Sequence, residues 1–321
     1  MVMQVSSFNT FGAIGNREDL SDQIYRIDPT ETPFFSGVDK VKSKATNHEW
    51  QTQALAAAST SNAQLEGDDN YNADAATATV RLGNICQISR KTPSVTGTQE
   101  SVESAGRGSE WDYQKMLKGL ELKRDVEAIL TGANQAKVTG ATTTARKLAD
   151  VLSWIKTNTD KGGGTGADPT AADGTSLRVD SATQRAFTEA QLKNVIKKCY
   201  DQGGKPDTIL MGSFNKQAFS MFPGRATATQ DATQKKITAA VDVYDSDFGK
   251  LKAVPDLFMR TRDVLVLEME KWAYASLPNR NFVFQPLAKT GDANKGSLLT
   301  EYTLEARNEK ASGGIFDLTS S

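Results

Sequence analysis

The chain of 321 residues contains one histidine, His48, which is its first candidate for acid–base chemistry. A catalytic serine or cysteine needs a base held beside it. His48 lies in a polar stretch with no nucleophile motif near it. We therefore interpret His48 as a residue on the face of a strand, and we predict no catalytic residue.

Three acidic residues close together in the sequence, Glu66, Asp68 and Asp69, could supply the oxygen ligands that a hard cation prefers. Their order differs from that of a calcium-binding loop. Because oxygen ligands alone are unspecific, a solvated, charged loop tip explains them better, and we predict no metal site. The glycine-rich residues 162–166 lack the Gly-Lys-Ser/Thr ending of a phosphate-binding loop, so we expect a flexible loop over 160–173.

Carboxylates and basic side chains are mixed along residues 110–130. Paired carboxylates such as Glu121, Asp125 and Glu127 can act as general acid and base. On a helix, mixed charge more often forms a solvated or ion-paired face. We therefore predict that the chain is not an enzyme and binds no cofactor. A carboxylate-dependent hydrolase remains an alternative, which would require a concave pocket with convergent carboxylates.

The overall charge is nearly balanced, with 38 Lys and Arg residues against 39 Asp and Glu residues. This balance argues against a dedicated nucleic-acid binder, which should be basic, although a protein that only encloses nucleic acid needs no basic excess. Cys86 and Cys199 have neither CxxC nor zinc-site spacing, so we expect both to be buried and reduced, as in a cytoplasmic folding environment. We expect no signal peptide and no membrane partner.

The elements that must position these residues begin with a polar N-terminal segment, residues 1–47. A short helix over 17–25 with Asn16 as its N-cap is favoured. The rest is expected to be extended, because Pro29 and Pro33 bias the residues before them away from the helical region. Such a segment buries little of itself, and we expect it to lie on another surface.

Residues 47–97 predict one long hairpin. Strand-like alternation covers residues 48–55 and resumes near residue 77, and the polar stretch between them would form the loop. We expect a bulge at Gly83-Asn84 and a continuation of the return strand over 85–95. Because an isolated two-stranded ribbon is marginally stable in water, a projecting ribbon indicates a docking partner.

The remaining chain predicts a long helix followed by an α/β unit. Ser109 is the expected N-cap of the helix over 109–130, and Gly132 its stop. A short amphipathic helix with Leu148, Val151, Leu152 and Ile155 is expected within residues 147–157. Thr188 and Gln191 predict a capping box at the start of a helix over 188–202, and Ser213 is expected to cap another. The expected strands are 208–211, 237–244, 250–254, 264–268, 272–277, 281–285 and 298–307.

This order of parts resembles the α+β major capsid fold of tailed bacteriophages, the Hong Kong 97-type fold, which encapsulin shells share. Locally the sequence is similar to the SU-ten-like phage major capsid protein family. The strings that carry this resemblance are GNREDLSD (15–22), PTETPF (29–34), EWQ (49–51), EGD (66–68), RLGN (81–84), ELKRD (121–125) and EARNEK (305–310).

The resemblance implies a division of the chain into an N-terminal arm (1–47), an extended β-hairpin loop (47–97), a peripheral domain with a spine helix and an inserted flexible segment (98–186), an axial domain (187–285) and a return to the peripheral domain (286–321). It implies a virion protein that self-assembles into hexamers and pentamers of an icosahedral or prolate shell around double-stranded DNA. Assembly would occur in the cytoplasm of the host bacterium, with portal, scaffolding or decoration proteins as potential partners. An encapsulin-like compartment is the nearest alternative.

The assembly contacts that we expect fall in three places. One is the arm, at Asn16, Arg17, Glu18 and Asp19. Another is Trp50 in the hairpin. The third is a docking contact in which the acidic loop tip at Glu66, Asp68 and Asp69 meets the basic side chains of a neighbouring copy's long helix. Those basic residues are Lys115, Lys118, Lys123 and Arg124.

Overall fold

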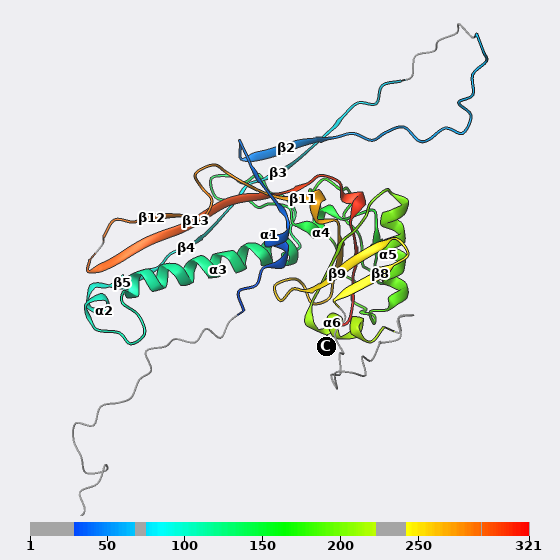
Figure 1. Cartoon of the computed structure of the whole chain (residues 1–321). Helices are drawn as coiled ribbons and strands as arrows, with labels where there is room; N and C mark the ends of the chain where they lie inside the picture. Colours follow the sequence, from blue (N-terminus) through cyan, green and yellow to red (C-terminus); the bar gives the residue numbers. More distant parts are fainter. Residues whose placement is uncertain (1–28, 68–74, 223–241, 290, 321) are drawn as a thin grey trace, which may run out of the picture.

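The computed structural model describes residues 29–67, 75–222, 242–289 and 291–320. Two sheets form an elongated body, with the long helix α3 at one end and the shorter helices α5 and α6 at the other (Figure 1). A two-stranded ribbon and its loop project from this body. No helix in these described ranges has the length and apolar character needed to cross a membrane.

The first sheet is built on one long strand, β13 (Ala293–Ala306), which begins five residues before the expected strand. It pairs with four antiparallel neighbours, and β11 in turn pairs in parallel with β1. The four neighbours of β13 are β4 (Gln87–Lys91), β5 (Ser94–Thr96), β11 (Trp272–Ser276) and β12 (Val283–Pro286). Strand β1 covers Asp39–Lys42.

The second sheet has the order β6-β14-β10-β7-β9-β8. Its strands are β6 (Thr159–Asp160), β7 (Thr208–Met211), β8 (Val243–Ser246), β9 (Gly249–Pro255), β10 (Val264–Leu267) and β14 (Gly313–Ile315). Two short 3-10 helices, Met269–Lys271 and Glu309–Ala311, precede β11 and β14. The expected hairpin of β8 and β9 is confirmed, although residues 237–241 lie outside the described ranges.

The sheet membership differs from the expected domain boundaries. Strands β11 and β12 were assigned to the unit 187–285, but they pair with β13 in the first sheet. Conversely β14, in the expected return segment 286–321, pairs with β10 in the second sheet. The chain therefore crosses between the two sheets twice after β10.

The helices follow their local capping signals where those signals are complete. Helix α3 (Glu110–Gly132) begins at Ser109, whose hydroxyl accepts a hydrogen bond from the Asp112 amide. Helix α5 (Glu189–Asp201) has the predicted capping box of Thr188 and Gln191. Helix α2 (Gly97–Ser101) links β5 to the region before α3.

Two helices differ from the prediction. Helix α4 covers only Val151–Trp154, because Asp150 caps it and the chain becomes extended at Ile155. Helix α6 (Ser213–Ser220) has Gly212 rather than Ser213 at its N-cap, and no side chain caps it. Residues 148–150 and Ile155 on either side of α4 are also buried, so the apolar pattern extended the predicted helix beyond its ends.

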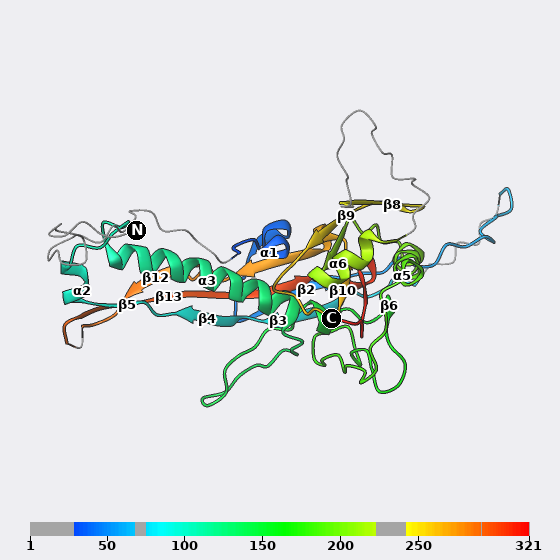
Figure 2. The same ribbon diagram turned by 90° about the horizontal axis from the view of Figure 1, so that it is seen from below.

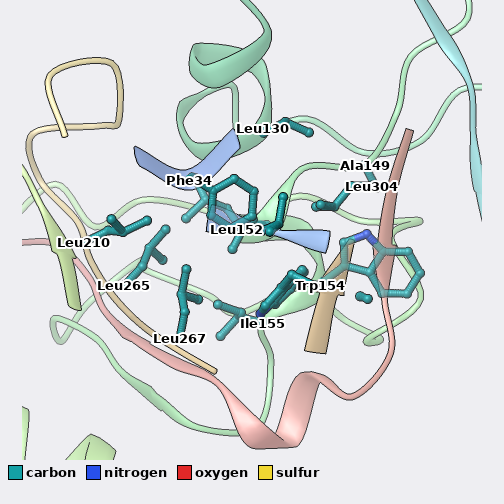
Figure 3. Packing of buried hydrophobic residues seen from close by; sticks show 14 of the residues in the cluster. Phe34, Leu130, Ala149, Leu152, Trp154, Ile155, Leu210, Leu265, Leu267 and Leu304 are labelled. Carbon is teal, nitrogen blue, oxygen red and sulfur yellow. The ribbon is translucent and has the colours of Figure 1, made fainter. Parts of the chain in front are cut away.

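Figure 2 shows α3 lying along β13 and β4, and α1 (Pro33–Gly37) lying next to it. The main hydrophobic core forms where these elements meet the second sheet. Figure 3 shows Phe34, Leu130, Trp154 and Leu265 converging there from four separate segments. A second core lies between α5 and the second sheet and includes Val195. Cys86 and Cys199 are buried and free, as predicted.

The expectation that residues 1–47 are extended and need another surface is wrong for residues 33–42. Pro33 occupies the first turn of helix α1, where the missing N–H of proline costs nothing. Phe34 is fully buried in the chain's own core, and β1 pairs with β11. The expected helix over 17–25 lies outside the described residues.

The ribbon is shorter than predicted and has no bulge. Strands β2 (Asn47–Thr52) and β3 (Val80–Ile85) pair in one unbroken register, with Glu49 opposite Gly83. The return strand then leaves the ribbon at Cys86, and β4 pairs with β13 instead. Asn84 is fully buried, and its amide donates to the Ala149 and Leu304 carbonyls at 3.0 Å and 2.8 Å, which offsets the cost of burying it.

Candidate interaction surfaces

The N-terminal segment is anchored by one carboxylate of α3. The backbone N–H groups of Phe34 and Phe35 donate to the two oxygens of Glu127, each at 2.7 Å. These are two of the donors that the start of a helix leaves without partners. The mixed charge of this helix predicts a solvated or ion-paired face, which is wrong for Glu127, because its side chain is fully buried and bound to backbone N–H groups.

Burial raises the pKa of the Glu127 carboxyl to about 7. The nearby Asp256 carboxyl adds to this rise, and the two backbone N–H groups oppose it. A sequence signal for this burial existed, since Glu127 precedes buried Leu130 and Thr131 by three and four residues, on one face of the helix.

The base of the ribbon is docked on the end of β13. The Trp50 Nε1–H donates to the Ala306 carbonyl at 2.9 Å, and the Trp50 ring lies 5.4 Å from the Trp154 ring between centroids. His48 Nε2 lies 2.8 Å from Glu305 Oε2. His48 is therefore a residue on a strand face, as predicted, whereas Trp50 was expected to contact another copy and packs within its own chain.

The loop beyond the ribbon base is exposed along its described residues, 53–67 and 75–79. Leu55 is 96% exposed and Leu65 is 81% exposed. Glu66 follows Leu65 in the sequence and lies in a turn with Gly67, which has φ +83°. The loop that carries them projects from the body (Figure 1). The other predicted tip residues, Asp68 and Asp69, lie outside the described residues, as do Asn16, Arg17, Glu18 and Asp19.

The basic residues predicted on α3 are each in contact with their own chain. Lys118 pairs with Glu121 at 2.7 Å, and Lys115 lies over the Phe284 ring at 4.8 Å. Lys123 and Arg124 lie over the rings of Phe35 and Phe258, at 5.6 Å and 5.2 Å. Within one chain, the loop that carries Glu66 projects away from this helix (Figure 1).

The hydrolase alternative finds no support in the surface cavities. Three of them have volumes of about 350, 350 and 340 Å³. Glu49 is the one carboxylate among the described residues that line them, and it pairs with Arg81 across the ribbon. Among the described residues, no three side chains of the metal-ligating types gather into a cluster.

Comparison with known proteins identifies the family to which the chain belongs. A family model described as "SU10 major capsid protein" matches residues 4–319. The chain belongs to this family. It is 27% identical over 346 residues to the major capsid protein of Escherichia phage Phieco32, with 96% of each chain covered.

Solved structures of phage capsids share the fold of this capsid protein. The capsid asymmetric unit of cyanophage A-1(L) has a TM-score of 0.65 at 12% identity, with 97% of this chain and 98% of that chain covered. The major capsid protein of phage G, solved with its decoration proteins, has a TM-score of 0.51 at 10% identity, with 99% and 100% covered. The predicted tailed-phage capsid fold and the prediction of a phage major capsid protein are confirmed. The protein is therefore a virion component that forms a shell with copies of itself.

Proposed function

We propose that this capsid protein assembles into hexamers and pentamers of a closed icosahedral or prolate shell that encloses double-stranded DNA. The observation that carries the proposal is the ribbon loop, whose exposed Leu55 and Leu65 have no cover within their own chain among the described residues. Each apolar side chain left in water forgoes about 1.5–3 kcal/mol of burial free energy. A neighbouring copy can supply the missing surface.

The two sheets suit two positions in such a ring. The second sheet with α5 and α6 would form the axial domain at the ring centre, and the first sheet with α3 would form the peripheral domain. A contact of this kind joins different surfaces of identical subunits and closes by rotation. The N-terminal arm and the ribbon would then overlap adjacent copies and add to the buried area.

The nearly balanced charge supports a wall that encloses DNA without binding it tightly. The proposal includes a portal at one vertex, and it includes scaffolding or decoration proteins as partners. It also includes assembly in the cytoplasm of the host bacterium, consistent with the two free, buried cysteines. The role is structural rather than catalytic.

Electron microscopy of the purified, overexpressed chain tests the proposal, with a ribbon-shortened variant as its matched comparison. In the variant, Thr52 is joined to Val80 by an Asn-Gly turn, which suits a two-residue hairpin. We expect closed particles from the full chain. The variant should yield folded subunits, because β2 and β3 keep their contacts within the chain. It should form no shells, because the loop that would contact a neighbouring copy is absent. Normal shells from the variant would contradict the role of the ribbon.

Two further measurements address the arm and the cargo. Deleting residues 1–20 should leave a folded subunit, because α1 remains bound to Glu127, but should reduce shell yield. Particles from infected cells should protect double-stranded DNA from nuclease. Shells that retain an enclosed enzyme instead of DNA would favour the encapsulin-like alternative.

A further inference from the structure

A cavity of about 350 Å³ lies on the body between α1, β1, α3 and β11. Its apolar wall consists of the rings of Phe35, Tyr274 and Phe282, and the Phe35 and Tyr274 rings meet edge to face at 4.9 Å. An engineered cavity of roughly 150 Å³ already admits benzene. This cavity is therefore large enough for a leucine side chain together with a neighbouring polar group.

One residue of the cavity wall, Phe282, has a strained backbone conformation. Phe282 has φ +51°, the left-handed region in which a bulky side chain is an outlier. Such strain costs about 1–3 kcal/mol and is concentrated at ligand-binding and functional positions. In this conformation the Phe282 ring lines the cavity and lies 6.0 Å from the Phe35 ring between centroids.

Two ammonium groups share the apolar wall. Lys40 Nζ lies 3.8 Å from the centroid of the Phe35 ring, and Lys123 Nζ lies 5.6 Å from the same centroid. Glu127 is the carboxylate whose charge acts on Lys40, but two backbone N–H groups already occupy its oxygens. Partial burial of its ammonium group lowers the pKa of Lys40 to about 8; the charge of Glu127 opposes this shift and the charge of Lys123 adds to it. The pair therefore presents positive charge that an incoming carboxylate would stabilise.

The loop tip offers the matching chemistry. Leu65 is 81% exposed, and Glu66 follows it directly at the turn. Asp68 and Asp69 add negative charge to the same short stretch of sequence. An apolar side chain beside a carboxylate complements a cavity that combines aromatic walls with two lysines.

We propose that the cavity bounded by Phe35, Tyr274 and Phe282 receives the loop tip of a second copy, with Leu65 on the rings and Glu66 between Lys40 and Lys123. The inference rests on the proposed shell assembly and deepens it by naming the two surfaces that meet. It also narrows the docking expected from sequence, because Lys115, Lys118 and Arg124 are not part of this cavity.

Charge exchange tests the electrostatic half of the contact. Glu66→Lys and Lys123→Glu should each lower shell yield at least tenfold, measured by sedimentation and electron microscopy. The double variant that carries both should recover to within about twofold of the unmodified chain. Lys197→Glu, an exposed charge reversal on α5, serves as the control and should not rescue Glu66→Lys.

Disulfide trapping tests the position. Leu65→Cys combined with Ser276→Cys, a half-buried cavity residue, should give a ladder of linked oligomers in oxidised shells, because a disulfide requires Cα atoms within about 7 Å. Leu65→Cys with Lys197→Cys should remain monomeric on the same denaturing gel. If shells form but the first pair gives no ladder and the charge exchange gives no rescue, this inference is wrong while the proposed function stands. If the unmodified chain forms no shell, both are wrong.

Discussion

Phe34 and Glu127 lie 93 residues apart in the sequence, yet the Phe34 backbone N–H donates to Glu127 Oε1 at 2.7 Å. Glu127 thereby takes the role of an N-cap for α1, since Thr32 makes no side-chain capping bond there. The same contact buries the Phe34 ring beside the core and fixes the point from which the N-terminal arm departs.

Replacing this carboxylate should destabilise the subunit. Glu127→Ala leaves the buried Phe34 N–H without an acceptor, at about 1–3 kcal/mol, and also removes the acceptor of the half-buried Phe35 N–H. Urea unfolding of dilute, unassembled subunits measures the loss. Glu121→Ala, a half-exposed residue of the same helix that pairs with Lys118, is the control and should change the unfolding free energy by less than about 1 kcal/mol. Equal losses for the two variants would contradict the capping role.

The pH dependence of stability should carry the signature of Glu127. Its pKa is raised from 4.5 to about 7 on folding, so between these values the native state holds a proton that the unfolded state has released. The free energy of unfolding should therefore fall as pH rises from 4.5 to 7. Asp150 and Asp263, whose pKa values burial also raises to about 7, contribute in the same direction.

Glu127→Gln removes one of these titrations and should flatten the slope across that window. Unfolding free energies measured at half-unit pH steps provide the comparison. Glu121→Gln should leave the slope unchanged. A slope in Glu127→Gln as steep as in the unmodified chain would show that Glu127 does not titrate there.

Trp50 should control how firmly the ribbon base is held. Trp50→Ala removes the bond to the Ala306 carbonyl and the contact with Trp154, so the base should open more often. Trypsin cleavage after Arg81, in the paired strand β3, should then accelerate severalfold, as followed by mass spectrometry. Gln51→Ala, the exposed neighbour on β2, should cleave at the original rate. An unchanged cleavage rate in Trp50→Ala would show that Trp50 does not hold the ribbon base on the body.

Asp317 should hold the inserted segment against the second sheet. Its carboxylate accepts from the Gly162 and Ser181 amides, at 3.1 Å and 2.8 Å, and from Arg262 at 2.9 Å. Asp317→Ala removes all three acceptor contacts and places alanine at φ +61°, so hydrogen exchange over 160–181 should increase strongly.

Asp317→Asn is the matched variant, because asparagine tolerates the left-handed conformation and keeps one acceptor oxygen. Its exchange rates should lie between those of Asp317→Ala and the unmodified chain. If both variants exchange at the original rate, the tether to Asp317 does not hold this segment.

The sequence by itself determined the elements whose signals are local. The Ser109 cap and the Thr188–Gln191 capping box each join residues three apart, so they do not depend on the rest of the fold. Strand β7 matches its predicted range, and the predicted turn between β8 and β9 is also present. The ordered strings spread along the chain were enough to indicate the family.

Only the tertiary structure decided which of these elements meet. The alternation over residues 85–91 is the same whether the strand continues the ribbon or joins β13, and burial against β13 decides it. In the sequence Glu127 is one of several charged residues of the helix. The structure shows that it binds the Phe34 and Phe35 N–H groups at the start of α1. Strand pairing and burial join residues far apart in the sequence. A local pattern therefore indicates that a residue needs a partner, but it does not identify that partner.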